Sequence, residues 1–184
     1  DSLDEAAPPT ELTDENLALR FTAEQTGLVE LAAASTGANG TAVALEYNDS
    51  AQRIRFRGTA GTVQLTSPDA GRIDGVSRMD IALDLGNVNV RGPGVLYAAE
   101  HQTDNPNAGP RRAIRWTDQA DFDFAVADGR MTDTLEQARF LGRVQAFGDA
   151  AELAGTAITA VFESATDGTE QANTRLSLLR VTDA

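Results

Sequence analysis

Apolar and polar residues alternate along the chain in short runs, and this two-residue period predicts the secondary structure. Ile54 and Phe56 share one face of an extended segment whose other face carries arginines. Because successive side chains of a strand point to opposite faces, each run buries one side only. Runs of this kind occupy residues 17–21, 29–33, 43–47, 54–56, 63–65, 79–85, 88–90, 114–126, 140–144 and 158–162. We therefore expect at least ten strands and almost no helix.

Each run also predicts which side chains face the interior. The expected inward set lies in phase with its own run and consists of Ile54, Phe56, Val63, Leu65, Ile81, Leu83, Val88, Val90, Phe124, Val144, Ile158 and Phe162. Residues 134–141 are helical on propensity alone but lack a sustained apolar stripe, so we expect a loop that runs into a strand. The polar residues 102–110 are expected to form a loop insertion.

Turn-forming residues separate the runs. The expected reversals are Asn48-Asp49-Ser50, Ser67-Pro68-Asp69, Gly92-Pro93-Gly94, Asp128-Gly129 and Asp167-Gly168. A loose repeat, apolar-x-apolar-x-Gly, ends at Gly58, Gly92 and Gly142. Glycine inside a strand pattern marks a bulge or a sharp corner. The three glycines therefore predict corners in a sheet whose short strands stack on each other.

Composition favours a wide, shallow β structure. Apolar residues make up 41% of the 184 residues and aromatic residues 5%, so the core must rest on Val, Leu, Ile and Ala. The alternation and the turns together predict an all-β fold, as a sheet, a sandwich or a roll. The net charge of −13 argues against a nucleic acid or a bare anionic bilayer as partner. No cysteine is present, which excludes disulfides and thiolate metal sites.

Two regions are expected along the chain. Residues 1–15 are acidic and contain Pro8-Pro9, as a linker does, and residues 16–184 form the β-roll domain. No apolar run reaches the length of a membrane helix. The C-terminal segment reads as a strand up to its end, and we expect the chain to be a fragment of a longer protein.

Few residues indicate chemistry, and no enzyme, cofactor or metal is expected. His101 is the only histidine and lies beside the polar loop, without a nucleophile-elbow pattern. Asp121 and Asp123, like Asp80 and Asp84, offer paired carboxylates for glycoside hydrolysis, but they alternate with apolar residues as the polar face of a strand does. Residues 104–109 have only a superficial likeness to a calcium loop.

Arginines form a local basic stripe on this acidic chain, at positions 53, 55 and 57. The stripe has two interpretations. It is a solvated strand face balanced by nearby acids, or it is a contact for a phosphate or carboxylate group, for which arginine is a bidentate donor.

The segment 138–163 resembles the repeating unit of the OstA-like family, the periplasmic lipopolysaccharide-transport proteins that include LptA and LptC. The similar places are Leu141-Gly142-Arg143-Val144, the turn Gly148-Asp149, then Leu153, and a strand from Ile158 to Phe162. Residues 44–65 match more weakly, with a strand ending at Tyr47, a turn, and a new unit from Ile54 to Gly58.

The resemblance implies an elongated antiparallel β-taco or β-jellyroll, in which two facing sheets enclose an apolar interior that holds lipid acyl chains. Its open ends stack onto other modules by strand pairing. The implied lipid-binding residues are Phe56, Leu65, Val90, Phe140, Val144, Ile158 and Phe162, and the first four are expected near a seam that solvent reaches. The implied partners are lipopolysaccharide or a related glycolipid and other OstA-like modules, and homo-oligomers fit the same edges. The implied location is the periplasm of a Gram-negative type bacterium, with a membrane anchor in the full-length protein.

Two other classes stay open from the residues alone. One is a non-catalytic β-repeat with a structural or adhesive role, and the other is a carbohydrate-active enzyme on a β-roll. A groove that takes up acyl chains favours the carrier, whereas a closed core with self-association favours the structural repeat. A cleft with two converging carboxylates of shifted pKa favours the enzyme.

Overall fold

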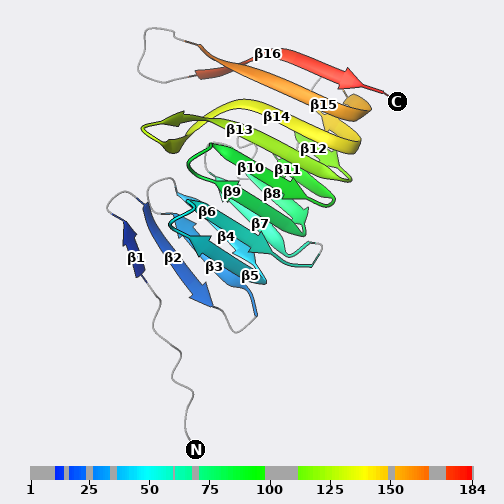
Figure 1. The fold of residues 1–184 in the computed structure, drawn as a ribbon. Coiled ribbons are helices and arrows are strands. Elements are labelled where there is room, and N and C mark those ends of the chain that lie inside the picture. The colour runs from blue at the N-terminus through cyan, green and yellow to red at the C-terminus, as the bar shows by residue number, and fades with distance from the viewer. Residues whose placement is uncertain are drawn as a thin grey trace, which may run out of the picture.

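The computed structural model describes residues 11–14, 17–23, 27–33, 37–59, 61–67, 71–97, 112–148, 152–165 and 173–183. In these residues all regular secondary structure is β-strand, and sixteen strands join in one antiparallel sheet (Figure 1). The sheet is folded over on itself and nearly closes into a barrel-like shape. The expected fold class, an all-β folded sheet, is confirmed.

The fold divides the strands into two layers. The first layer contains β5 (Ala44–Asn48), β6 (Arg53–Arg57), β9 (Arg78–Ala82), β10 (Asn87–Arg91) and β13 (Gln119–Ala127). The second contains β4 (Ala38–Ala42), β7 (Val63–Ser67), β8 (Gly71–Val76), β11 (Gly94–Tyr97) and β12 (Ala113–Trp116). Strand β14 (Arg130–Phe147) belongs to both layers, because one part pairs with β13 and a later part with β12.

The two ends of the folded sheet differ. At one end, β15 (Glu152–Ala165) pairs with β14, and β16 (Asn173–Thr182) pairs with the later part of β15. At the other end the second layer continues from β4 into β3 (Val29–Ala33), β2 (Leu17–Ala23) and β1 (Glu11–Asp14). In Figure 1, β16 lies at the top and β1 at the lower left.

Backbone hydrogen bonds continue where the chain crosses from one layer to the other. We call this line of crossings the fold line. The Gly58 amide donates to the Ser77 carbonyl at 2.9 Å, and the Gly92 amide donates to the Asp118 carbonyl at 2.9 Å. The Asp118 amide in turn donates to the Leu141 carbonyl at 3.2 Å. The bend therefore leaves these amides satisfied, which a buried backbone requires.

The three repeat glycines lie on this fold line, as predicted. Gly92 and Gly142 have φ of +90° and +95°, a region that L-residues rarely adopt. A Cβ added at Gly142 would also lie 2.7 Å from Cγ of Asp118, and one at Gly58 would collide with Thr62. The chain turns at Gly92-Pro93-Gly94 from one layer to the other, so this turn is not a hairpin and β10 and β11 do not pair with each other.

Apolar side chains fill the space between the layers beside the fold line. A row of residues paired across neighbouring strands of the first layer is 0–1% exposed: Phe56, Met79, Val90, Ala120, Phe140 and Ile158. The ring centroid of Phe140 lies 5.4 Å from that of Trp116 in the second layer. All expected inward residues belong to this core or pack against it, so that prediction is confirmed.

One local prediction is wrong. Residues 134–141 were expected to begin as a loop, but they lie inside β14. The strand forms because β14 has β13 on one edge and β15 on the other, and these nonlocal pairings override the weak local pattern. Several predicted features lie outside the described residues: the insertion at 102–110, Pro68 of the turn after β7, the turn at 167–168 and most of the 1–15 linker.

Gly142→Val tests the fold line. We expect it to lower the free energy of unfolding by about 1–3 kcal/mol, because valine is strained at this φ and meets the side chains of Thr117 and Asp118 and the Asp118 amide nitrogen. Gly61→Val is the control, because Gly61 has φ of +87° but no atom within 4 Å of an added Cβ. Urea denaturation measures both variants. Equal losses at the two positions would remove the close-packing part of the argument.

Candidate functional site

The predicted lipid-binding residues fall into two groups in the structure. Phe56, Val90 and Phe140 are 0% exposed and belong to the buried row beside the fold line. Their expected place near a solvent-reached seam is therefore wrong. Val144 and Ile158 are also buried, whereas Leu65 and Phe162 are half-buried and pack against the outside of the core.

Burial decreases with distance from the fold line. In the first layer, the row after the fully buried one is 3–6% exposed: Ile54, Ile81, Val88, Phe122, Ala138 and Ala160. Farther from the fold line lie half-buried apolar residues, which we call the apolar margin. They follow both buried rows in the first layer and the single buried row of Val63, Val76, Trp116 and Val144 in the second. The members of the apolar margin are Leu83, Phe124, Leu135 and Phe162 in the first layer and Leu65, Leu96, Ile114 and Leu153 in the second. Apolar surface thus becomes accessible on the side away from the fold line.

The sequence pattern predicted that residues of the apolar margin face inward, but not how far from the fold line they lie. Leu83, Phe124 and Ile114 lie in predicted alternating runs. Of the residues in the apolar margin, only Leu65 and Phe162 are predicted lipid contacts. Leu96 and Leu135 were missed, because Leu96 stands in a short strand and Leu135 follows a bulge in β14. Distance from the fold line depends on where each strand crosses between layers, which alternation does not show.

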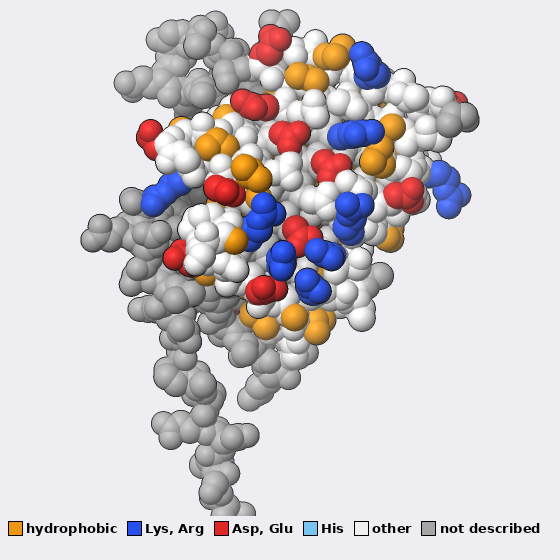
Figure 2. Space-filling view, viewed as in Figure 1, with side chains coloured by type: hydrophobic (Ala, Val, Ile, Leu, Met, Phe, Trp, Pro, Cys, Tyr) orange, Lys and Arg blue, Asp and Glu red, His pale blue; other side chains and the backbone are white. Residues whose placement is uncertain are grey.

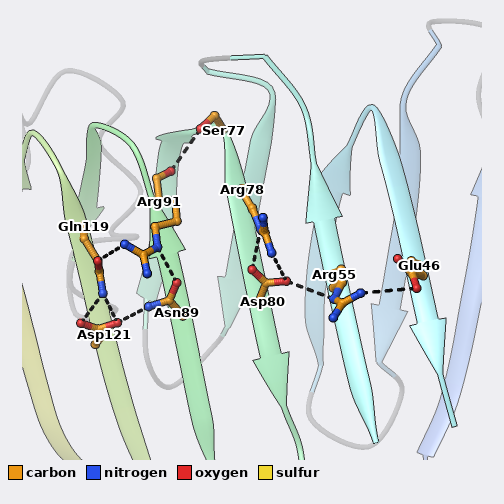
Figure 3. A network of polar contacts seen from close by, with 9 residues as sticks. All are labelled: Glu46, Arg55, Ser77, Arg78, Asp80, Asn89, Arg91, Gln119 and Asp121. Carbon is orange, nitrogen blue, oxygen red and sulfur yellow. Dashed lines mark hydrogen bonds and ion pairs between the residues drawn. The ribbon is translucent and has the colours of Figure 1, made fainter. Parts of the chain in front are cut away.

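The outer side of the first layer carries a polar ladder across neighbouring strands. Paired positions run Glu46, Arg55, Asp80, Asn89, Asp121, Arg139, Thr159 and Arg180. Arg55 pairs with Asp80 at 3.3 Å and with Glu46 at 3.6 Å, and Asn89 donates to Asp121 (Figure 3). Figure 2 shows basic and acidic side chains intermixed over this face.

The arginine stripe joins this ladder in part. Arg55 has its two acidic partners, which favours the interpretation as a balanced strand face at that position. Arg78 on β9 binds Asp80 at 2.6 Å, and this hydrogen bond and the charge of Asp80 raise the pKa of the Arg78 guanidinium above its usual value. Arg91 donates to Asn89 at 3.0 Å and also to Gln119.

The candidate carboxylate pairs take part in hydrogen bonds rather than facing a cleft. Asp121 accepts from Asn89 and Gln119, and Asp123 accepts from Asn87 at 2.6 Å. Asp84 lies in the turn after β9, so it does not share a strand face with Asp80. His101 and the 104–109 segment lie outside the described residues.

In the described part of the chain, no group of three or more His, Cys, Asp or Glu side chains is placed to hold a metal ion. Also within those ranges, no helix is both long and apolar enough to cross a membrane.

An open groove of about 700 Å³ lies over the second layer near the fold line. Its polar lining comes from Arg115 on β12 and Thr117 just after it, Arg143 and Gln145 on β14, Thr156 on β15, and Asp183 after β16. No sequence motif marked this groove. Alternation placed Arg115 between two inward residues, Ile114 and Trp116, but its neighbours on β14 come from a distant part of the chain.

Comparison with known proteins gives no match, whether to family models, to curated proteins or to solved structures.

Asp80→Asn tests the polar ladder. We expect a loss of about 0.2–1 kcal/mol of stability that shrinks in high salt, because the side chains of Arg55 and Arg78 are 40% and 46% exposed. Thermal unfolding at low and high salt measures it, with the exposed Asp84→Asn as control. A loss of about 3–5 kcal/mol, typical of a broken buried ion pair, would contradict the surface character of the ladder.

Proposed function

We propose that the chain is a non-catalytic carrier module that shelters the acyl chains of lipopolysaccharide or a related glycolipid in the periplasm. The observation that supports this function is the apolar margin, where half-buried side chains of both layers lie on the side away from the fold line. The folded sheet is also the architecture that the OstA-like resemblance implies.

The energetics favour acyl chains at the margin rather than at the fold line. Burying each methylene of a lipid contributes roughly 0.8 kcal/mol, provided that the methylene meets apolar surface. Side chains such as Leu65 and Phe162 retain accessible apolar surface for this contact, whereas Phe56 and Phe140 do not. The net charge of −13 disfavours phosphate contacts of a lipid at the margin, so its recognition there rests on the acyl chains, and dephosphorylated lipid binds about as well.

Photo-crosslinking from cells tests the carrier function. A photoreactive residue at Leu65 or Phe162 should capture glycolipid, because both positions belong to the apolar margin. Leu141 is the matched control, since it is also apolar and half-buried but pairs with Gln119 on the outer side of the first layer. Capture at Leu141 equal to that at the margin, or none at either margin position, would rule out the carrier function.

A second function, a structural β-repeat that associates end to end, is favoured by strand β16. This strand exposes Leu176, Leu178 and Leu179 by 42–48%, and within the described residues it pairs only with β15. Exposed apolar residues on an unpaired strand edge favour addition of another strand. Such association also serves a carrier that bridges two membranes, so the two functions are compatible.

The polar ladder suggests how two copies would pair. The ladder begins at Glu46 on the edge strand β5 and ends at Arg180 on β16. β5 runs away from the fold line and β16 runs toward it, so β5 of a second copy can add to β16 in antiparallel orientation. If the register continues, Glu46 of the second copy lies opposite Arg180, and its Leu45 and Tyr47 lie opposite Val181 and Leu179.

Charge reversal tests this pairing by sedimentation velocity over a range of concentrations. We expect Arg180→Glu to weaken association and the double variant with Glu46→Arg to restore it, because opposite charges directly across strands attract. Reversal at Arg139, in the middle of the ladder, is the control. A wild-type chain that stays monomeric at high concentration would exclude the pairing. The carrier function would then depend on the crosslinking result alone.

A further inference from the structure

We propose that the groove over the second layer binds a phosphorylated saccharide, with Arg115 and Arg143 holding its phosphate. The site lies on the outer side of the folded sheet and does not depend on the apolar margin. It is therefore independent of the proposed carrier function.

The strand register brings the two arginines together. Arg115 on β12 pairs with Gln145 on β14, and Arg143 lies two residues before Gln145 on the same strand. The Arg143 amide donates to Oγ1 of Thr117 at 2.9 Å, which continues the contact between these strands. Because Ile114 and Val144 pack in the core, Arg115, Gln145 and Arg143 point outward. Diagonal neighbours in such a pair lie about 7–8 Å apart, within reach of a single anion between two arginines.

These arginines lack the acidic partners that others have. The chain has 28 acidic and 15 basic residues, and Arg55, Arg72 and Arg78 each pair with a carboxylate. Among the described residues, neither Arg115 nor Arg143 forms an ion pair. The nearby carboxylate of Asp74, on β8, is already paired with Arg72 at 2.7 Å. Two arginines that form no ion pair among the described residues thus line one groove of an otherwise acidic protein.

The guanidinium of Arg115 lies beside an aromatic ring. Its carbon atom is 5.4 Å from the ring centroid of Phe147, a cation–π distance. Phe147 lies two residues beyond Gln145 on β14, on the opposite side from Arg143, so the Arg115 side chain has to turn away from this ring to share a phosphate with Arg143. A guanidinium then forms bidentate hydrogen bonds to phosphate. The amide of Gln145 lies between the two arginines in the register and offers both a donor and an acceptor for hydroxyl groups.

The groove is too large for phosphate alone. Its volume of about 700 Å³ falls in the range of small-molecule sites, roughly 300–1,000 Å³. Gly75, Gly94 and Gly155 line it without side chains, and Val95 and Ala154 add apolar surface. This surface suits the C–H face of a sugar ring, while Arg115, Arg143 and Gln145 suit its phosphate and hydroxyls. Asp183 also lines the groove and opposes an anion.

Calorimetric titration of the whole chain with glucose 1-phosphate, inorganic phosphate and glucose tests the site. We expect glucose 1-phosphate to bind more tightly than inorganic phosphate, and glucose not to bind measurably. Arg115→Gln and Arg143→Gln should each weaken glucose 1-phosphate binding about tenfold or more, since each removes charge-assisted hydrogen bonds. Asp183→Asn should tighten binding, because it removes the opposing charge.

Arg57→Gln is the control, because Arg57 is exposed on the outer side of the other layer. It should leave the affinity for glucose 1-phosphate unchanged, and circular dichroism checks that each variant folds. Inorganic phosphate binding as tightly as glucose 1-phosphate would overturn the saccharide part. No binding of glucose 1-phosphate, or equal loss in the Arg57 variant and the groove variants, would overturn the site itself.

Discussion

Backbone hydrogen bonding across the fold line is the constraint on which the rest of the structure depends. A sheet that folds sharply normally breaks its ladder, and unsatisfied buried amides are costly. Here the amides of Gly58, Gly92 and Asp118 find carbonyls on the next crossing, so the two layers remain one sheet. Glycine at positions 92 and 142 permits the positive φ that the crossing requires.

The fold line also determines how the interior is filled. Both layers start from the same line, so side chains beside it are enclosed by the bend and by the opposite layer. Phe56 and Phe140 are fully buried there, and Trp116 closes the second layer with its indole nitrogen donating to the Gly92 carbonyl at 3.0 Å. Farther from the line, Leu65 and Phe162 are only half-buried. A single sheet therefore provides a packed core on one side and accessible apolar surface on the other.

The outer sides of the two layers differ in their electrostatics. On the first layer, Arg55 and Arg78 share Asp80, so the polar ladder largely satisfies itself. On the second layer, Arg115 and Arg143 face a groove without such partners. All fifteen basic residues of the chain are arginines, and arginine suits both roles, because its planar fork binds a carboxylate on the protein or a phosphate on a ligand.

Residue alternation alone determined that the chain is all-β, which side chains face inward, and that Gly58, Gly92 and Gly142 mark corners. These features are local, since a strand presents alternate residues to alternate sides whatever its partner. Tertiary structure decided the rest. It placed Phe56 at the closed fold line and Leu65 at the margin, and it brought Arg115 beside Arg143. Those relations depend on which strands pair and where each one crosses between layers, and such long-range pairings leave no period in the sequence.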